Sequence, residues 1–122
     1  MNKLTYNFHC LDGYYHLEVT FGLDKLNFLV ETSIDGLVNN EGELSSNDFI
    51  NQLNEANLES WNKEYNAYGT SIEDATTFDV TLEKDGKTYS SKGEESYEPY
   101  KYELLIKALM ILDPQSKYLL FK

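Results

Sequence analysis

Apolar and polar residues alternate through the first third of the chain, and this period of two predicts β-strands. The alternation is interrupted at Asp12-Gly13, a dipeptide that favours a two-residue hairpin turn. A turn at these two residues pairs apolar residues throughout the hairpin: Cys10–Tyr15, Phe8–Leu17, Tyr6–Val19 and Leu4–Phe21. An expected third strand continues the pattern with Leu26, Phe28, Val30 and Ile34.

The spacing then changes to that of a helix, after residues 38–43, which are expected to form a loop. Residues 45–48 supply polar N-cap candidates. The apolar residues that follow recur at helical spacing: Phe49, Ile50, Leu53 and Ala56. Asn57 is the expected end of this helix, and residues 58–65 are expected to form a short turn or second helix.

The second half predicts a hairpin and a last helix. A fourth strand carries Phe78, Val80 and Leu82 at alternate positions, and Asp85-Gly86 is its hairpin turn. The returning strand spans residues 87–92 and ends at Gly93, so that Asp79 pairs with Lys92 and Leu82 with Tyr89. Pro99 is the expected first helical residue. The apolar stripe of this last helix is Leu104, Leu105, Ala108, Ile111 and Leu112.

These elements predict one α+β domain over residues 1–122, in the order βββ-α-ββ-α. We expect an antiparallel sheet of about five strands with the helices packed on one of its faces.

Composition narrows the function classes. The 122 residues carry a formal net charge of -11, and all ten basic residues are lysine. A chain without arginine and with this charge is a poor candidate for direct nucleic-acid or anionic-membrane binding. One cysteine, no apolar leader and no apolar stretch of membrane-spanning length indicate a soluble protein of the cytoplasm.

Candidate chemistry is sparse. The expected hairpin places His9 opposite His16 with Glu18 beside them, a group that could hold a divalent metal, although a paired surface position is the simpler interpretation. Cys10 falls on the apolar side of its strand, away from both histidines, which argues against a nucleophile–base pair. No phosphate-binding, zinc-protease or serine-hydrolase motif is present. We therefore expect a protein that is not an enzyme and has no cofactor or metal.

The acidic residues are concentrated in the first two thirds of the chain. Residues 1–83 hold fifteen acidic residues and three lysines. On the first helix, Asp48, Gln52, Glu55 and Glu59 form one polar stripe if the helix extends that far. The predicted partner-binding residues are Glu41, Glu43, Asp48, Glu55, Glu59, Tyr68, Glu73 and Asp74. Such a surface fits a basic protein partner, although a solvated face that keeps the protein soluble explains the same pattern.

The second half of the chain resembles a small domain of unknown function from low-GC Gram-positive bacteria and their phages. The resemblance covers about residues 49–112. It is carried by these segments: Trp61-x3-Tyr65, the strand 78–82, Asp85-Gly86-Lys87, Gly93 and Tyr97-x-Pro99. The chain departs from that pattern at residues 73–75, at Phe78 and at Glu98. In general style, a small, acidic, tyrosine-rich domain without arginine is also similar to phage anti-CRISPR proteins.

Two functions follow as hypotheses. The first is a nucleic-acid mimic: a phage inhibitor of the anti-CRISPR type whose acidic surface occupies the basic groove of a CRISPR effector nuclease or a similar protein. The alternative is a bacterial immunity or housekeeping module that binds another protein through Trp61, Tyr65 and the C-terminal helix.

Overall fold

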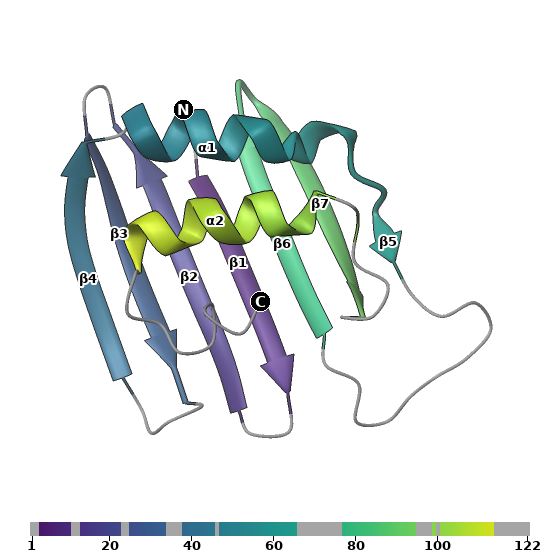
Figure 1. Ribbon diagram of the computed structural model, residues 1–122, viewed down its shortest axis with the longest axis horizontal. Coiled ribbons are helices and arrows are strands. Elements are labelled where there is room, and N and C mark those ends of the chain that lie inside the picture. Colours follow the sequence, from purple (N-terminus) through teal and green to yellow (C-terminus); the bar gives the residue numbers. More distant parts are fainter. Residues whose placement is uncertain are drawn as a thin grey trace.

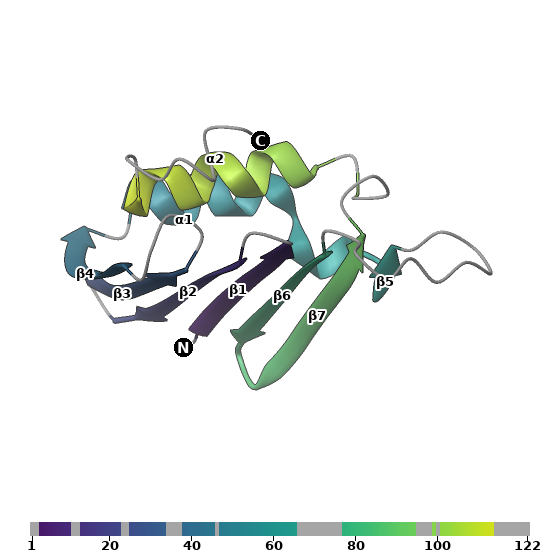
Figure 2. The same ribbon diagram turned by 90° about the horizontal axis from the view of Figure 1, so that it is seen from below.

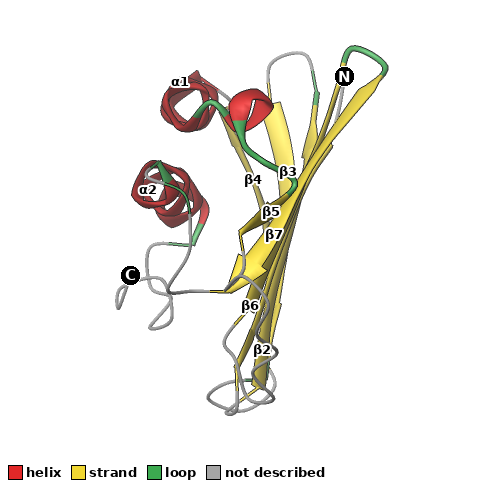
Figure 3. Cartoon of the chain, turned by 90° about the vertical axis from the view of Figure 1, so that its right-hand side faces the viewer, coloured by secondary structure: helices red, strands yellow, loops and turns green. Residues whose placement is uncertain are grey.

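A computed structural model shows two helices lying across one face of a single β-sheet (Figure 1). The structure describes residues 3–10, 13–22, 25–33, 38–45, 47–65, 77–94, 99 and 101–113, with the backbone alone at 38–45. Both helices lie on the same side of the sheet, and the described elements leave its other face uncovered (Figure 3). The expected α+β class, with helices on one face, is confirmed.

The described sheet contains seven strands in the order β4-β3-β2-β1-β6-β7-β5. Their bounds are β1 Lys3–Cys10, β2 Gly13–Phe21, β3 Lys25–Thr32, β4 Val38–Ser45, β5 Glu64–Tyr65, β6 Thr77–Lys84 and β7 Lys87–Glu94. The helices are α1 Asn47–Ala56, the short 3-10 helix η1 Leu58–Ser60 and α2 Tyr102–Leu112. All neighbouring strands are antiparallel except β5 and β7, which are parallel. The additions to the expected sheet are β4 and the two-residue β5.

The first hairpin has the predicted strands and faces but not the predicted register. Cys10 pairs with Gly13 and Phe8 with Tyr15, so the expected pairs are shifted by two residues and the connection is residues 11–12. A shift of two leaves every side chain on its expected face, because side chains alternate with a period of two. The alternation of apolar residues therefore could not distinguish the two registers.

The stretch 38–43 is a strand and not the expected loop. It belongs to β4, which pairs with β3 without interruption from Thr32↔Val38 to Lys25↔Ser45. An edge strand is held by backbone hydrogen bonds along one side, so it forms without the apolar alternation that marks a core strand.

The second hairpin is confirmed in both turn and register. Asp79 pairs with Lys92 and Leu82 with Tyr89. Asp85 and Gly86 both have positive φ, 54° and 80°, as the tight turn requires. Gly93 does not end β7, because it pairs with Phe78 inside the strand.

The helices differ from prediction mainly at their ends. Residues Phe49, Leu53 and Ala56 of α1 are buried as expected, and Asn57 ends the helix in the left-handed conformation at φ 48°. In contrast, α2 begins at Tyr102 and not at Pro99, whose carbonyl accepts a hydrogen bond from the Tyr102 amide at 3.0 Å.

The buried face of α2 is also rotated from the expected stripe. The buried residues of α2 are Tyr102, Leu105, Ile106, Ala108, Leu109 and Leu112, whereas Ile111 is 38% exposed and Leu104 is half-buried. Consecutive apolar residues, 104–106 and 108–112, give several possible stripes, so their spacing does not determine which side faces the sheet.

Figure 2 shows the sheet and the helices as two layers, and the buried residues of the core come from both. Two tyrosines of the sheet reach the second helix: Tyr6 Oη lies 2.5 Å from Tyr102 Oη, and Tyr15 Oη donates to Asp113 Oδ2 at 2.8 Å. These bonds let large tyrosine side chains be buried without loss of their hydroxyl hydrogen bonds. They fix the last helix over the centre of the sheet.

Candidate functional site

The outer face of α1 is the part of the predicted acidic surface that the structure describes best. Its exposed side chains are Asn47, Asp48, Asn51, Asn54 and Glu55. The helix contains no basic residue, and neither Asp48 nor Glu55 has a cationic partner among the described residues. Gln52 Nε2 donates to Glu55 Oε2 at 3.4 Å, a long contact that leaves the carboxylate accessible. The face therefore presents asparagine amides and two free carboxylates to solvent.

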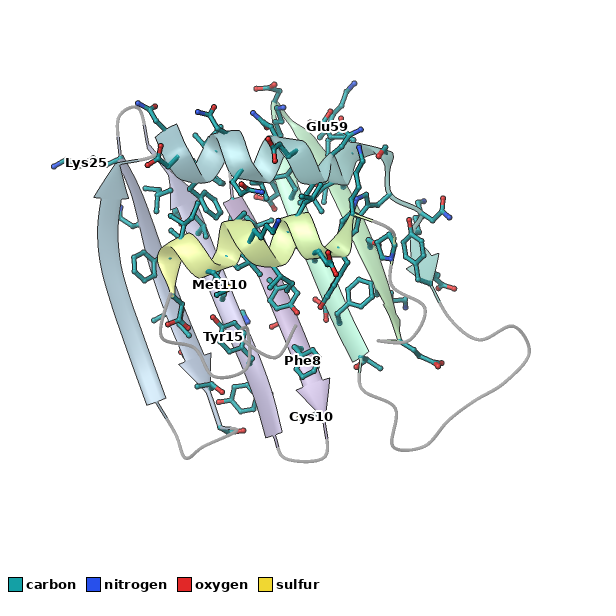
Figure 4. The ribbon with its side chains drawn as sticks, in the orientation of Figure 1. Phe8, Cys10, Tyr15, Lys25, Glu59 and Met110 are labelled. Carbon is teal, nitrogen blue, oxygen red and sulfur yellow. The ribbon has the colours of Figure 1, made fainter. Side chains whose placement is uncertain are left out.

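Glu59 does not continue this stripe along one helix. The helix ends at Ala56, the left-handed Asn57 redirects the chain, and Glu59 lies in η1 (Figure 4). Lys84 Nζ donates to Glu59 Oε1 at 2.9 Å. This hydrogen bond and the charge of Glu59 raise the pKa of Lys84. The Glu59 carboxylate is thus offset by a lysine from the β6–β7 hairpin.

The remaining predicted binding residues divide into two groups. Glu41 and Glu43 belong to the edge strand β4, where they pair with Leu29 and Asn27 of β3. Three others lie outside the described residues: Tyr68, Glu73 and Asp74. The structure therefore assigns the described acidic candidates to β4, α1 and η1, which follow one another along the chain.

A polar row that the sequence analysis did not identify crosses the uncovered face of the sheet. In register from β3 to β7 the row is Glu31, His16, Asn7, Asp79 and Lys92. Asn7 Nδ2 donates to Asp79 Oδ1 at 2.8 Å, and Asn7 Oδ1 is hydrogen-bonded to His16 Nδ1. His16 Nε2 lies 3.4 Å from Glu18 Oε1. If Nδ1 carries the proton that bonds Asn7, a hydrogen bond from Nε2 to Glu18 requires a second proton on the ring. The sequence analysis could not identify this row, because its β1–β2 register did not pair Asn7 with His16.

The expected opposition of His9 and His16 is wrong, because the register pairs His9 with Tyr14 and His16 with Asn7. The arrangement of His9, His16 and Glu18 that could have held a divalent metal is therefore not formed. Among the residues that the structure describes, no group of three or more His, Cys, Asp or Glu side chains is arranged to hold a metal ion. Cys10 is half-buried against the core, as its position on the apolar side of the strand predicts.

Trp61 and Tyr65, the residues of the alternative hypothesis, make contacts inside the fold. Trp61 Nε1 donates to the Ala56 carbonyl at 2.8 Å, and its ring packs on Tyr102 with centroids 6.4 Å apart. Tyr65 Oη accepts a hydrogen bond from the Asn62 amide at 2.7 Å. These contacts give both side chains a structural role, and their use in binding a partner stays a prediction.

A small pocket is lined by residues of α1 and η1 and of the ends of β2 and β6. The residues that line it are Phe21, Ile50, Leu53, Asn54, Asn57, Leu58, Glu59, Leu82 and Lys84. Its volume is about 200 Å³, less than the range usual for a small-molecule or cofactor site. The Glu59–Lys84 ion pair lies among these lining residues, and both of its charges are already satisfied.

No protein-family model matches the chain, and no curated protein matches it. Within its described part, no helix has the length and apolar character needed to cross a membrane.

Proposed function

We propose that this protein is a non-enzymatic, acidic binding protein that inhibits a nucleic-acid-handling partner by occupying its basic groove. In the specific form that we propose, it is a phage-encoded inhibitor of the anti-CRISPR type that acts on a CRISPR effector nuclease in the host cytoplasm. Carboxylates on its surface take the positions that phosphates of the nucleic acid otherwise occupy. Its own charge of -11 keeps it from binding the nucleic acid directly.

The observation that carries this proposal is the outer face of α1. This face is exposed, and it presents Asp48 and Glu55 without a neutralising cation in the described structure. Unpaired carboxylates on a regular element increase the association rate with a cationic surface, and salt weakens that effect. A merely solvated face needs neither regular spacing nor the exclusion of lysine.

The test is inhibition of DNA cleavage by a panel of purified CRISPR effector nucleases. The informative variant is Asp48→Lys with Glu55→Lys, which reverses both free charges and avoids the internally paired Glu59. Its matched control is Glu83→Lys with Glu103→Lys, which changes net charge equally at exposed positions of β6 and α2. We expect the parent and the control to inhibit at least one nuclease and the α1 variant to lose inhibition, with a slower association rate that depends less on salt.

Two results would overturn the proposal. One is a panel in which no nuclease is inhibited by excess protein. The other is an α1 variant that inhibits as strongly as the parent, because the acidic face of α1 would then have no part in binding.

A further inference from the structure

The outer edge of the sheet at β4 is open in the described structure. The strand is the last in the sheet on its side, and all eight of its residues pair with β3 on the other side (Figure 1). At the opposite edge, by contrast, β7 is covered in part by the parallel β5. Within the described structure, β4 therefore has a neighbouring strand on one side only, along its whole length.

The hydrogen bonds of β3 show which groups of β4 face away from the sheet. The Ser33 amide donates to the Tyr14 carbonyl at 3.0 Å, and the Gly22 amide donates to the Lys25 carbonyl at 2.8 Å. The odd-numbered residues of β3 therefore direct their backbone groups towards β2, and the even-numbered ones direct theirs towards β4. Their β4 partners Val38, Asn40, Gly42 and Leu44 use their backbone groups against β3.

The intervening residues Asn39, Glu41 and Glu43 consequently direct their N–H and C=O groups outward. Natural sheets protect such edges with lysine, proline, a β-bulge or a very short strand. The β4 sequence has no lysine or proline, its pairing with β3 runs without a bulge, and its length is eight residues. An edge of this kind is a template for the addition of another strand.

The charge of β4 indicates which kind of segment this edge binds. Four residues of β4 have outward-facing backbone groups, Asn39, Glu41, Glu43 and Ser45; two of them are glutamates, and β4 contains no basic residue. A second copy of the chain, paired antiparallel through β4, would bring the glutamates of both copies together, which is unfavourable. An extended segment with lysine or arginine at alternate positions places cations there instead.

We propose that β4 binds an extended basic segment of the partner by strand addition. This inference rests on the basic partner of the proposed function, but it assigns the contact to backbone groups of β4 and not to α1. Backbone hydrogen bonds provide affinity that does not depend on side-chain sequence, and the glutamates select for basic residues.

The first experiment tests the direction of the backbone groups. Asn39→Pro removes an outward N–H and is expected to leave the β3–β4 pairing intact, as proline is tolerated on the open side of an edge strand. Asn40→Pro, its matched control, removes an N–H that bonds β3 and is expected to abolish protection of the neighbouring β4 amides in hydrogen exchange. Equal disruption by the two variants would refute the assigned direction and the proposal with it.

The second experiment measures binding of a synthetic peptide of about ten residues with lysine and threonine alternating. The control peptide has the same sequence with every backbone nitrogen methylated, so it keeps the charge but cannot add as a strand. We expect the first peptide alone to protect the Glu41 and Glu43 amides from exchange. Asn39→Pro should weaken its binding by about tenfold, which corresponds to one or two lost hydrogen bonds. Glu41→Gln with Glu43→Gln should weaken binding and reduce its dependence on salt.

Three outcomes would overturn strand addition: equal binding of the two peptides, unchanged exchange at Glu41 and Glu43, or self-association of the free protein that protects the same amides. None of these depends on α1, so the Asp48→Lys, Glu55→Lys variant separates the two proposals. Loss of inhibition in that variant with no effect of Asn39→Pro would support the α1 surface and refute the β4 contact.

Discussion

A substitution of Gly93 is the most direct test of how β5 is held against the sheet. At this position β5 and β7 approach too closely for any side chain. A Cβ at residue 93 would lie 2.2 Å from the Tyr65 carbonyl oxygen and 2.7 Å from Tyr65 Cβ. Contacts of this kind are normally no closer than 3.4 Å, so Gly93→Ala requires the strands to separate by about 1.2 Å. The Lys92 amide, which donates to the Lys63 carbonyl at 3.0 Å, would then lose its bond.

The cost follows from what this separation removes. Each lost backbone hydrogen bond costs about 1 kcal/mol, and strain from the inserted methyl group adds about 1–3 kcal/mol. We therefore expect Gly93→Ala to lower the free energy of unfolding by about 2–4 kcal/mol. Urea denaturation measures the loss, and hydrogen exchange at the Lys92 amide shows whether it arises at β5.

Gly86→Ala is the control for this variant. A Cβ at Gly86 meets no atom within 4 Å, but φ is +80°, so the substitution introduces strain in the turn without touching β5. It should lower stability by about 1 kcal/mol and leave the Lys92 amide protected. If Gly93→Ala unfolds within about 0.5 kcal/mol of the parent and its Lys92 amide stays protected, the close approach of β5 and β7 is refuted.

Four further substitutions test the core and the ion pair. Tyr102→Phe should lower unfolding free energy by about 1 kcal/mol in urea denaturation, and adding Tyr6→Phe should cost less than the two single effects together, because the hydroxyls bond each other at 2.5 Å. Ser91→Ala should be neutral or stabilise by up to about 1 kcal/mol, because the Ser91 hydroxyl is buried without a hydrogen-bond partner in the described structure; a clear loss of stability would contradict this. Lys84→Met should cost less than about 1 kcal/mol of stability at neutral pH, since the side chains of Lys84 and Glu59 are 39% and 42% exposed and solvent weakens their attraction. Because Glu59 raises the pKa of Lys84 above 10.5, the advantage of the parent should persist below pH 10.5 and disappear as pH rises through the folded pKa.

The sequence predicted the faces of the strands better than their pairing. Apolar alternation placed Phe8, Tyr15 and Leu17 on the buried side correctly. It could not fix the β1–β2 register, because a two-residue shift preserves every face. The same Asp-Gly rule gave the correct β6–β7 register, where Asp85 and Gly86 are the turn residues, but failed for β1–β2, where Gly13 pairs with Cys10.

The candidate site shows the same division between local and long-range information. Helical spacing was enough to place Asp48 and Glu55 on the exposed side of α1. The ion pair of Glu59 with Lys84 joins residues 25 positions apart, so no local pattern could predict it. Likewise, β4 exists because β3 offers it a backbone partner along its whole length, which its polar sequence does not reveal.

That residues 38–43 form a strand, and not the predicted loop, matters for function because it alters what their charges can do. In a loop, Glu41 and Glu43 could only add to a diffuse negative potential. In an open edge strand they accompany fixed hydrogen-bonding groups, so that attraction and geometry act on the same partner segment. Because β4 ends at Ser45 and α1 begins at Asn47, the open edge and the first turn of α1 are close together along the chain. A partner that uses both should lose affinity additively when Asn39→Pro is combined with Glu55→Lys, since the two changes remove separate contacts.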